Sequence, residues 1–229
     1  TERAYKAREM VFELLLADQP DRETHPDPDS EFWKWSDSVG VSSSRFAPCG
    51  KPAQDASHPA IAVNLDACIA CNLCERACRE VQVNDVIGMA DRGSHTVPVF
   101  DLADPMGLSS CVACGECVSA CPTGALMEKS LLDETSRTRE VYADEVIDSV
   151  CPFCGVGCQL TYKVRDDKIA WVEGRSGPAN ENRLCVKGRF GFDYVAHPHR
   201  LTQPMIRRAD APPKGMDVDP ADPWTHFRE

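Results

Sequence analysis

The feature that most constrains this chain is a cysteine spacing, Cys-x2-Cys-x2-Cys-x3-Cys, that occurs twice. The first run holds Cys68, Cys71, Cys74 and Cys78, and the second holds Cys111, Cys114, Cys117 and Cys121. This spacing places three thiolates on one tight loop and is typical of polypeptides that bind a [4Fe-4S] cubane. One run alone is compatible with chance or with zinc. Two runs in the same order favour iron–sulfur clusters.

The two runs are expected to exchange their fourth cysteines. In two-cluster bacterial ferredoxin sequences, the fourth cysteine of each run binds the cluster of the other run. The predicted first site is therefore Cys68, Cys71, Cys74 and Cys121. The predicted second site is Cys111, Cys114, Cys117 and Cys78. We expect one [4Fe-4S] cluster at each site, and a chain that transfers electrons.

A third group has the spacing Cys-x2-Cys-x3-Cys-x26-Cys. This predicted third site is Cys151, Cys154, Cys158 and Cys185. Residues 160–164 and 168–173 flank two aspartates and predict a β-hairpin inside the group. Gly155 and Gly157 are expected to let the backbone approach a metal closely. Zinc is the alternative here, but zinc ribbons usually close with a second Cys-x2-Cys pair rather than one cysteine. We expect a third [4Fe-4S] cluster.

The composition supports metal binding and argues against a disulfide scaffold and against non-specific nucleic-acid binding. Twelve of the thirteen cysteines fall in these groups, whereas a disulfide scaffold would scatter them. Cys49 stands alone, and we expect that it is not a ligand. Thiolate ligands need a reducing compartment, and neither an apolar run of about 18 residues nor a signal peptide is visible, so we expect a cytoplasmic protein without a membrane span. A formal net charge of −11 argues against non-specific nucleic-acid binding.

The predicted fold class is α+β, built from small units that metal holds together. Residues 1–60 should form an N-terminal helix (1–18) and a linker, with Phe32, Trp33 and Trp35 packing one short helix onto the body. Residues 61–140 should form a two-cluster ferredoxin-like domain with strands near 61–65, 81–86 and 96–100, and a hairpin extension between the runs. Residues 141–208 should form a small β-rich domain, with a strand or an extended arm at 200–208. Residues 209–229 should form an irregular, proline-rich tail.

Several longer stretches are similar to a known family. They are the run from Val63 to Cys74, Cys151-Pro-Phe-Cys-Gly-Val-Gly-Cys, Arg183-Leu-Cys-Val-Lys-Gly-Arg-Phe-Gly and His197-Pro-His-Arg-Leu-Thr-Gln-Pro-Met-Ile-Arg. The chain resembles the iron–sulfur region of the alpha (catalytic) subunit of NAD-linked molybdenum or tungsten formate dehydrogenases. That region is related to the large iron–sulfur subunit of NADH dehydrogenase. The resemblance implies that residues 141–208 are a [4Fe-4S] domain of the molybdopterin oxidoreductase type.

The resemblance also implies cofactors and partners outside this segment. Bis-molybdopterin guanine dinucleotide with Mo or W would bind in a domain after Glu229, so the segment alone lacks a catalytic centre. Lys187 would relay electrons between the third cluster and the pterin, although it could also be a solvated turn lysine. The expected partners are flavin/NAD-binding and [2Fe-2S] subunits. An additional cubane, which the large NADH dehydrogenase subunit binds, is not expected, because no cysteine precedes Cys49.

Three other functions remain open from the sequence. A free-standing polyferredoxin would carry the same cysteine runs. Another molybdopterin enzyme, such as an assimilatory nitrate reductase, would share the third site, although the double run directly upstream favours formate dehydrogenase. A zinc-only structural module would be colourless. Since residue 1 is Thr rather than Met, we expect the segment to begin inside a longer chain.

Overall fold

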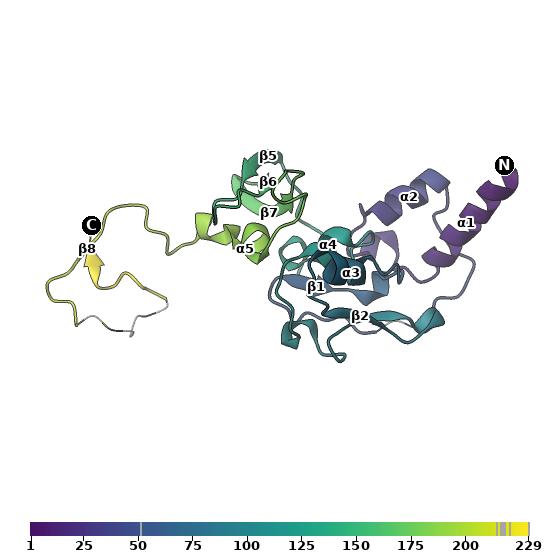
Figure 1. The fold of residues 1–229 in the computed structure, drawn as a ribbon, viewed down its shortest axis with the longest axis horizontal. Coiled ribbons are helices and arrows are strands. Elements are labelled where there is room, and N and C mark those ends of the chain that lie inside the picture. The colour runs from purple at the N-terminus through teal and green to yellow at the C-terminus, as the bar shows by residue number, and fades with distance from the viewer. Residues whose placement is uncertain (51, 214, 216–218, 220, 229) are drawn as a thin grey trace.

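The computed structural model describes residues 1–50, 52–213, 215, 219 and 221–228. Two N-terminal helices lie at one end of the long axis, the cysteine-bearing units lie in the middle, and the C-terminal segment lies at the other end (Figure 1). Short helices alternate with small antiparallel sheets, so the α+β prediction is confirmed. Within the described ranges, no helix is both long and apolar enough to cross a membrane.

The N-terminal helix forms as predicted. Helix α1 spans Glu2–Leu16, and the hydroxyl of Thr1 caps its first turn. Helix α2 spans Glu31–Val39 and ends at Gly40, whose φ of 79° is left-handed. A short 3₁₀ turn, η1 (Arg22–Thr24), lies between them.

The aromatic cluster of α2 is only partly buried. Phe32 and Trp33 pack against Leu16 of α1 in one apolar core. Trp35 is 55% exposed, so its predicted packing role is wrong. The reason is helical geometry, since Trp35 lies outside the face that carries Phe32, Trp33 and Ser36.

The ferredoxin-like unit is built on one antiparallel strand pair. Strand β1 (Ile61–Val63) pairs with β4 (Leu126–Glu128), which joins the beginning of the unit to its end. All of β1 is buried, and the chain turns into η2 (Leu65–Ala67) before the first cysteine run. Helix α3 (Leu73–Arg76) continues into the π-helical turn η3 (Ala77–Val81), and α4 spans Glu116–Ala120.

The region between the runs contains a hairpin, as predicted, but its first strand begins later. Strand β2 (Ile87–Ala90) pairs with β3 (Val97–Phe100) across η4 (Gly93–His95). The strand predicted near 81–86 is wrong. Val81 ends η3, and Val83 has a φ of 57° and is 79% exposed. Alternating valines there reflect a turn that leads into the hairpin, not a strand.

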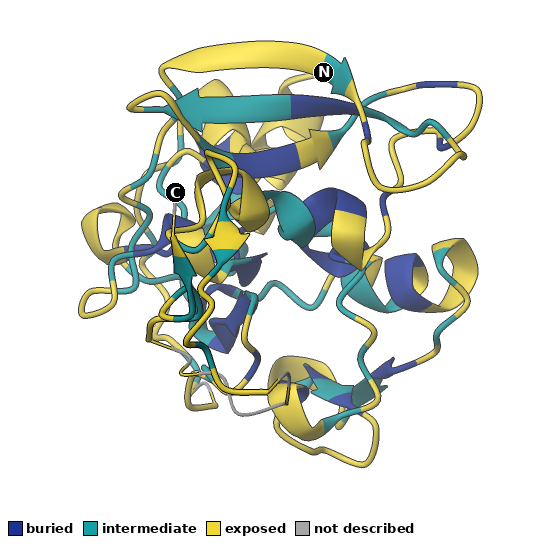
Figure 2. Cartoon of the chain, turned by 90° about the vertical axis from the view of Figure 1, so that its left-hand side faces the viewer, coloured by how far each residue is buried: buried dark blue, intermediate teal, exposed yellow. Residues whose placement is uncertain are grey.

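The second unit is a three-stranded sheet covered by a short helix. Strands β5 (Glu145–Val150), β6 (Gln159–Arg165) and β7 (Lys168–Gly174) pair in that order, and the predicted hairpin is confirmed as β6–β7. Asp166 and Asp167 both have positive φ, as a two-residue type I′ turn requires. The outer strand β5 is exposed along most of its length (Figure 2). Helix α5 (Val186–Phe190) packs on β7.

The remaining elements are short. They are η5 (Met106–Leu108), η6 (Lys129–Leu131), η7 (Gly191–Ala196), β8 (Ile206–Arg207) and β9 (Phe227–Arg228). The segment predicted at 200–208 is therefore mostly an extended arm, with a two-residue strand that pairs with β9. Residues 214, 216–218, 220 and 229 of the predicted tail lie outside the described residues.

Candidate metal centres

The two cysteine runs fold into loops with the same backbone conformation. Ala70 and Ala113 occupy equivalent positions and have φ of 51° and 54°. Each donates its N–H to the thiol sulfur two residues earlier, at 3.3 Å for Cys68 and 3.4 Å for Cys111. An alanine with positive φ is strained, and such strain persists where the surroundings over-determine the backbone, often at functional sites. The loops therefore aim backbone donors at sulfur, as a thiolate requires.

The first predicted site lines one small cavity. The lining includes all four of its cysteines: Cys68, Cys71, Cys74 and Cys121. Cys68 and Cys71 come from the loop that leads into α3, Cys74 lies in α3, and Cys121 directly follows α4. Apolar residues of β2, β3 and β4 complete the wall, namely Met89, Pro98 and Leu126.

The second predicted site lines another small cavity. Its four cysteines, Cys78, Cys111, Cys114 and Cys117, again come from both runs. Cys78 lies in η3, whereas Cys117 lies in α4. The tertiary structure thus brings the crossed sets together, with α3 and η3 packed against α4.

Several cysteines of these sites are costly to ionise without a cation. Burial, together with the neighbouring Cys121, Cys68 and Cys71, raises the pKa of Cys74 to about 12. Burial also raises the pKa of Cys117 well above its ordinary value. Iron ions would supply positive charge that stabilises the thiolates. Four sulfurs around each cavity, with N–H donors aimed at them, therefore fit an iron–sulfur cluster.

The third predicted site lies at one end of the three-stranded sheet. Cys151 follows β5 and Cys158 precedes β6, and the Cys151 N–H donates to the Cys158 carbonyl at 2.8 Å. Burial raises the pKa of Cys158, and the neighbouring Cys151, Cys154 and Cys185 raise it further, so the four thiols lie together. Cys154 and Cys185 are exposed, so this site faces solvent more than the other two.

The two glycines of the third site differ. Gly157 has a φ of 70°, which a side chain would strain. Gly155 lies in an ordinary backbone conformation, and a β-carbon there would meet none of the described atoms within 4 Å. The turn therefore requires a glycine at position 157 but not at 155.

A single metal ion needs its ligands closer together than a [4Fe-4S] cluster does. In the part of the chain that the structure describes, no three His, Cys, Asp or Glu side chains are close enough to hold one metal ion. A zinc ion with bonds of 2.3 Å would hold four sulfurs about 3.8 Å apart. A cubane separates its thiolates more widely, because four iron and four sulfide atoms lie between them.

Two protein families match the two units. The 4Fe-4S dicluster domain matches residues 67–125, which contain both cysteine runs. The molybdopterin oxidoreductase Fe4S4 domain matches residues 144–197, which contain the third site. The chain carries these two domains in tandem. The predicted resemblance and order of domains are thereby confirmed, and both domains are of the iron–sulfur kind found in electron-transferring molybdopterin oxidoreductase subunits.

The chain is similar in sequence to curated proteins that are named as subunits or members of several kinds of redox enzyme. The alpha subunit of an NADPH-Fe(3+) oxidoreductase of Geobacter sulfurreducens is 36% identical over 65% of this chain and 17% of its own length. One subunit of an NADH-quinone oxidoreductase of Rhizobium meliloti is 38% identical over 66% of this chain and 17% of its own. A putative formate dehydrogenase of Bacillus subtilis is 32% identical over 69% of this chain and 20% of its own. The chain thus spans about a fifth or less of these relatives.

Two side chains near sulfur escaped the sequence analysis. Asn84 Nδ2 donates to Cys114 Sγ at 3.9 Å in the second site. The Thr123 hydroxyl lies 3.6 Å from Cys121 Sγ in the first site. Hydrogen bonds to ligand sulfur are one way in which proteins set cluster potentials. The sequence could have identified these two residues by their position after a cysteine run. Thr123 follows Cys121 by two residues, and Asn84 follows Cys78 by six.

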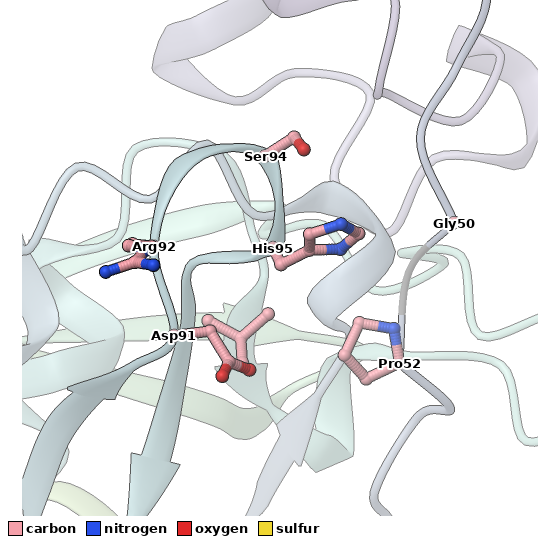
Figure 3. Close-up of a pocket in the computed structure, with 7 residues that line it drawn as sticks. Gly50, Pro52, Asp91, Arg92, Ser94 and His95 are labelled. Carbon is pink, nitrogen blue, oxygen red and sulfur yellow. The ribbon is translucent and has the colours of Figure 1, made fainter.

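Other candidate residues lie away from the cavities. Cys49 lines neither cavity, and its N–H donates to Asp18. Lys187 is exposed on α5, two residues after Cys185. A larger open pocket lies beside the β2–β3 turn, and the described residues that line it include no cysteine (Figure 3): Gly50, Pro52, Asp91, Arg92, Ser94, His95 and Val97. This pocket is therefore separate from the three predicted sites.

Proposed function

We propose that this chain transfers electrons through three [4Fe-4S] clusters. The proposed ligands are Cys68, Cys71, Cys74 and Cys121 for the first cluster, Cys78, Cys111, Cys114 and Cys117 for the second, and Cys151, Cys154, Cys158 and Cys185 for the third. One observation carries the proposal. Each of two cavities is lined by four cysteines, three from one run and one from the other. Such clusters exchange single electrons while their ligands stay fixed.

The proposed setting is the alpha subunit of a formate dehydrogenase. The chain would link a metal–pterin centre that oxidises formate to a flavin/NAD-binding partner and a [2Fe-2S] subunit. Support comes from the Fe4S4 domain itself and from the Bacillus subtilis relative named as a putative formate dehydrogenase. The exposed thiols of the third site would face the pterin domain, and Lys187 would lie between them and the pterin.

Iron and sulfide analysis tests the cluster proposal. The anaerobically reconstituted chain should hold about twelve iron and twelve sulfide, because each cubane contains four of each. A brown chromophore and three reducible paramagnetic centres should accompany this content. A plateau near eight irons, with zinc bound at Cys151–Cys185, would restrict electron transfer to the dicluster domain.

A second candidate is an NAD(P)H-linked oxidoreductase that does not use formate. The observation that favours it is the similarity to the NADPH-Fe(3+) oxidoreductase alpha subunit and to the NADH-quinone oxidoreductase relative. A polypeptide extended past Glu229 into a pterin domain distinguishes the candidates. Formate-dependent dye reduction by the extended polypeptide would support formate dehydrogenase, and NAD(P)H-dependent reduction alone, with its flavin partner, would support the second candidate.

The 229-residue chain by itself should not oxidise formate. It should accept electrons from dithionite and pass them to an acceptor dye, because its cysteines are assigned to clusters and none is left to bind a pterin metal, apart from the isolated Cys49. Formate turnover by this segment, free of longer enzyme, would contradict the proposed division of roles.

A further inference from the structure

A buried ion pair joins the dicluster domain to the Fe4S4 domain. Arg189 lies on α5, four residues after Cys185, and is 1% exposed. Its Nη2 donates to Glu116 Oε1 at 2.7 Å, and its Nε donates to the carbonyl of Cys114 at 2.9 Å. Glu116 is the first residue of α4 and lies between Cys114 and Cys117 of the second site. One arginine of the third-site unit therefore holds the loop of the second site.

The same glutamate also holds the chain next to the third site. Glu116 Oε1 accepts the N–H of Leu184, which directly precedes Cys185, at 3.2 Å. The side chain of Gln82, just after η3, donates to the Leu184 carbonyl at 3.4 Å. The N–H and the carbonyl of Leu184 thus both form hydrogen bonds with residues of the dicluster domain. A hydrogen-bonded path runs from the Cys114 carbonyl through Arg189 and Glu116 to the residue before Cys185.

The loop of the second site is shaped to admit the arginine. Gly115 separates Cys114 from Glu116 and has a φ of 75°. A β-carbon at this position would collide with Cδ and Nε of Arg189. Glycine is therefore required at position 115 for two reasons: the left-handed backbone and the close approach of Arg189. In the first run the equivalent position is Asn72, which has similar φ but faces no such arginine contact among the described residues.

We propose that Arg189 and Glu116 are positioning residues for electron transfer between the second and third clusters. They would hold the two cluster loops at a fixed separation and set the potential of the second cluster. This inference rests on the proposed function, because it needs a cluster at both sites. In the step itself, one electron would leave the reduced third cluster and enter the oxidised second cluster, or the reverse, and no bond in the protein would break.

The electrostatic effect of each residue has a definite sign. A reduced cluster carries one more negative charge than an oxidised one, so a nearby cation favours reduction and a nearby anion opposes it. Water screens this pair poorly, because the side chains of Arg189 and Glu116 are 1% and 10% exposed. A buried unit charge beside the cluster would change the ratio of reduced to oxidised cluster about tenfold. Removing the cation should lower the potential of the second cluster, and removing the anion should raise it.

The loaded chain allows both effects to be measured. Arg189→Met should make the second cluster about tenfold harder to reduce, and the isosteric Glu116→Gln should make it easier to reduce by a similar factor. Redox titrations followed by electron paramagnetic resonance give these shifts. Removing one partner of a buried pair should also lower the ratio of docked to separated domains about a hundredfold or more. The magnetic coupling between the second and third clusters should therefore weaken in Arg189→Met.

Two further variants keep the test decisive. Arg189→Lys retains the charge but cannot make both hydrogen bonds, so the potential should stay close to that of the unsubstituted chain while the coupling weakens. If Arg189→Met fails to fold, the coupling in Arg189→Lys still tests whether the two hydrogen bonds hold the domains together. Arg183→Met is the matched control, because Arg183 pairs with Glu181 on the surface of the same unit and its side chain is 49% exposed. It should change neither the potential of the second cluster nor the coupling.

The results separate failure of this inference from failure of the proposed function. Potential shifts of opposite sign in Arg189→Met and Glu116→Gln, with weakened coupling in Arg189→Met, support the link. Twelve irons in the unsubstituted chain, together with no shifts or shifts in the same direction, would overturn the link alone. About eight irons in the unsubstituted chain, with no third cluster signal, would overturn both.

Discussion

Lowering the pH should destabilise the N-terminal helices through His25. This side chain is 0% exposed, and its ring meets Trp33 edge-on with centroids 5.5 Å apart. Nδ1 lies 3.1 Å from both the amide nitrogen and the carbonyl oxygen of Asp27, and Nε2 lies 3.0 Å from Gln19 Oε1. Burial lowers the pKa of His25 from 6.5 to about 4. The folded protein therefore holds this histidine neutral.

The sign and size of the effect follow from the two pKa values. Above pH 6.5 the ring is neutral in both the folded and the unfolded chain, so its full contribution to stability is present. As the pH falls below 6.5, the unfolded chain binds a proton that the folded chain does not, and stability is lost until the folded pKa near 4 is passed. Each pH unit in this window costs about 1.4 kcal/mol. The loss at pH 5 should be about 2 kcal/mol.

Anaerobic urea unfolding between pH 5 and 7.5, followed by tryptophan fluorescence, measures this loss. The variant His25→Gln should lose the titration and show a flatter dependence on pH, although it is less stable at pH 7.5. The exposed His95→Gln is the control and should keep the slope of the unsubstituted chain. A nuclear magnetic resonance titration that places the pKa of His25 near 6.5, or equal slopes in both variants, would refute the reasoning.

Three further tests, with five substitutions in all, address other assignments. Cys49→Ser should leave iron content unchanged, whereas Cys74→Ser should lose or convert a cluster; loss of about four irons from Cys49→Ser would overturn the ligand sets. Lys187→Ala should lower the potential of the third cluster only, because a cation favours the reduced state, and an unchanged potential would make it an ordinary surface lysine. Gly115→Ala should destabilise the chain by about 2 kcal/mol or more, whereas Gly155→Ala should stay within about 0.5 kcal/mol, as unfolding measurements can show.

The secondary-structure elements that depend mainly on neighbouring residues could be predicted from the sequence. The β6–β7 hairpin was predictable because Asp166-Asp167 between two β-branched stretches favours a type I′ turn. Helix α1 was predictable from its apolar spacing. The strand predicted near residues 81–86 was wrong, because alternation over so few residues does not distinguish a strand from a turn. Val83 lies in that turn, and the strand begins only at Ile87.

The sequence by itself determined which cysteines lie on one loop, because a spacing of two or three residues leaves the backbone few ways to arrange the thiols. Only the tertiary structure decided what surrounds them. Arg189 and Glu116 are 73 residues apart, and Asn84 lies 30 residues from Cys114. No short-range pattern of charge or hydrophobicity marks such pairs. They meet because the packing of α5 against the loop before α4 removes both side chains from water, and a buried charge is then stable only beside its partner.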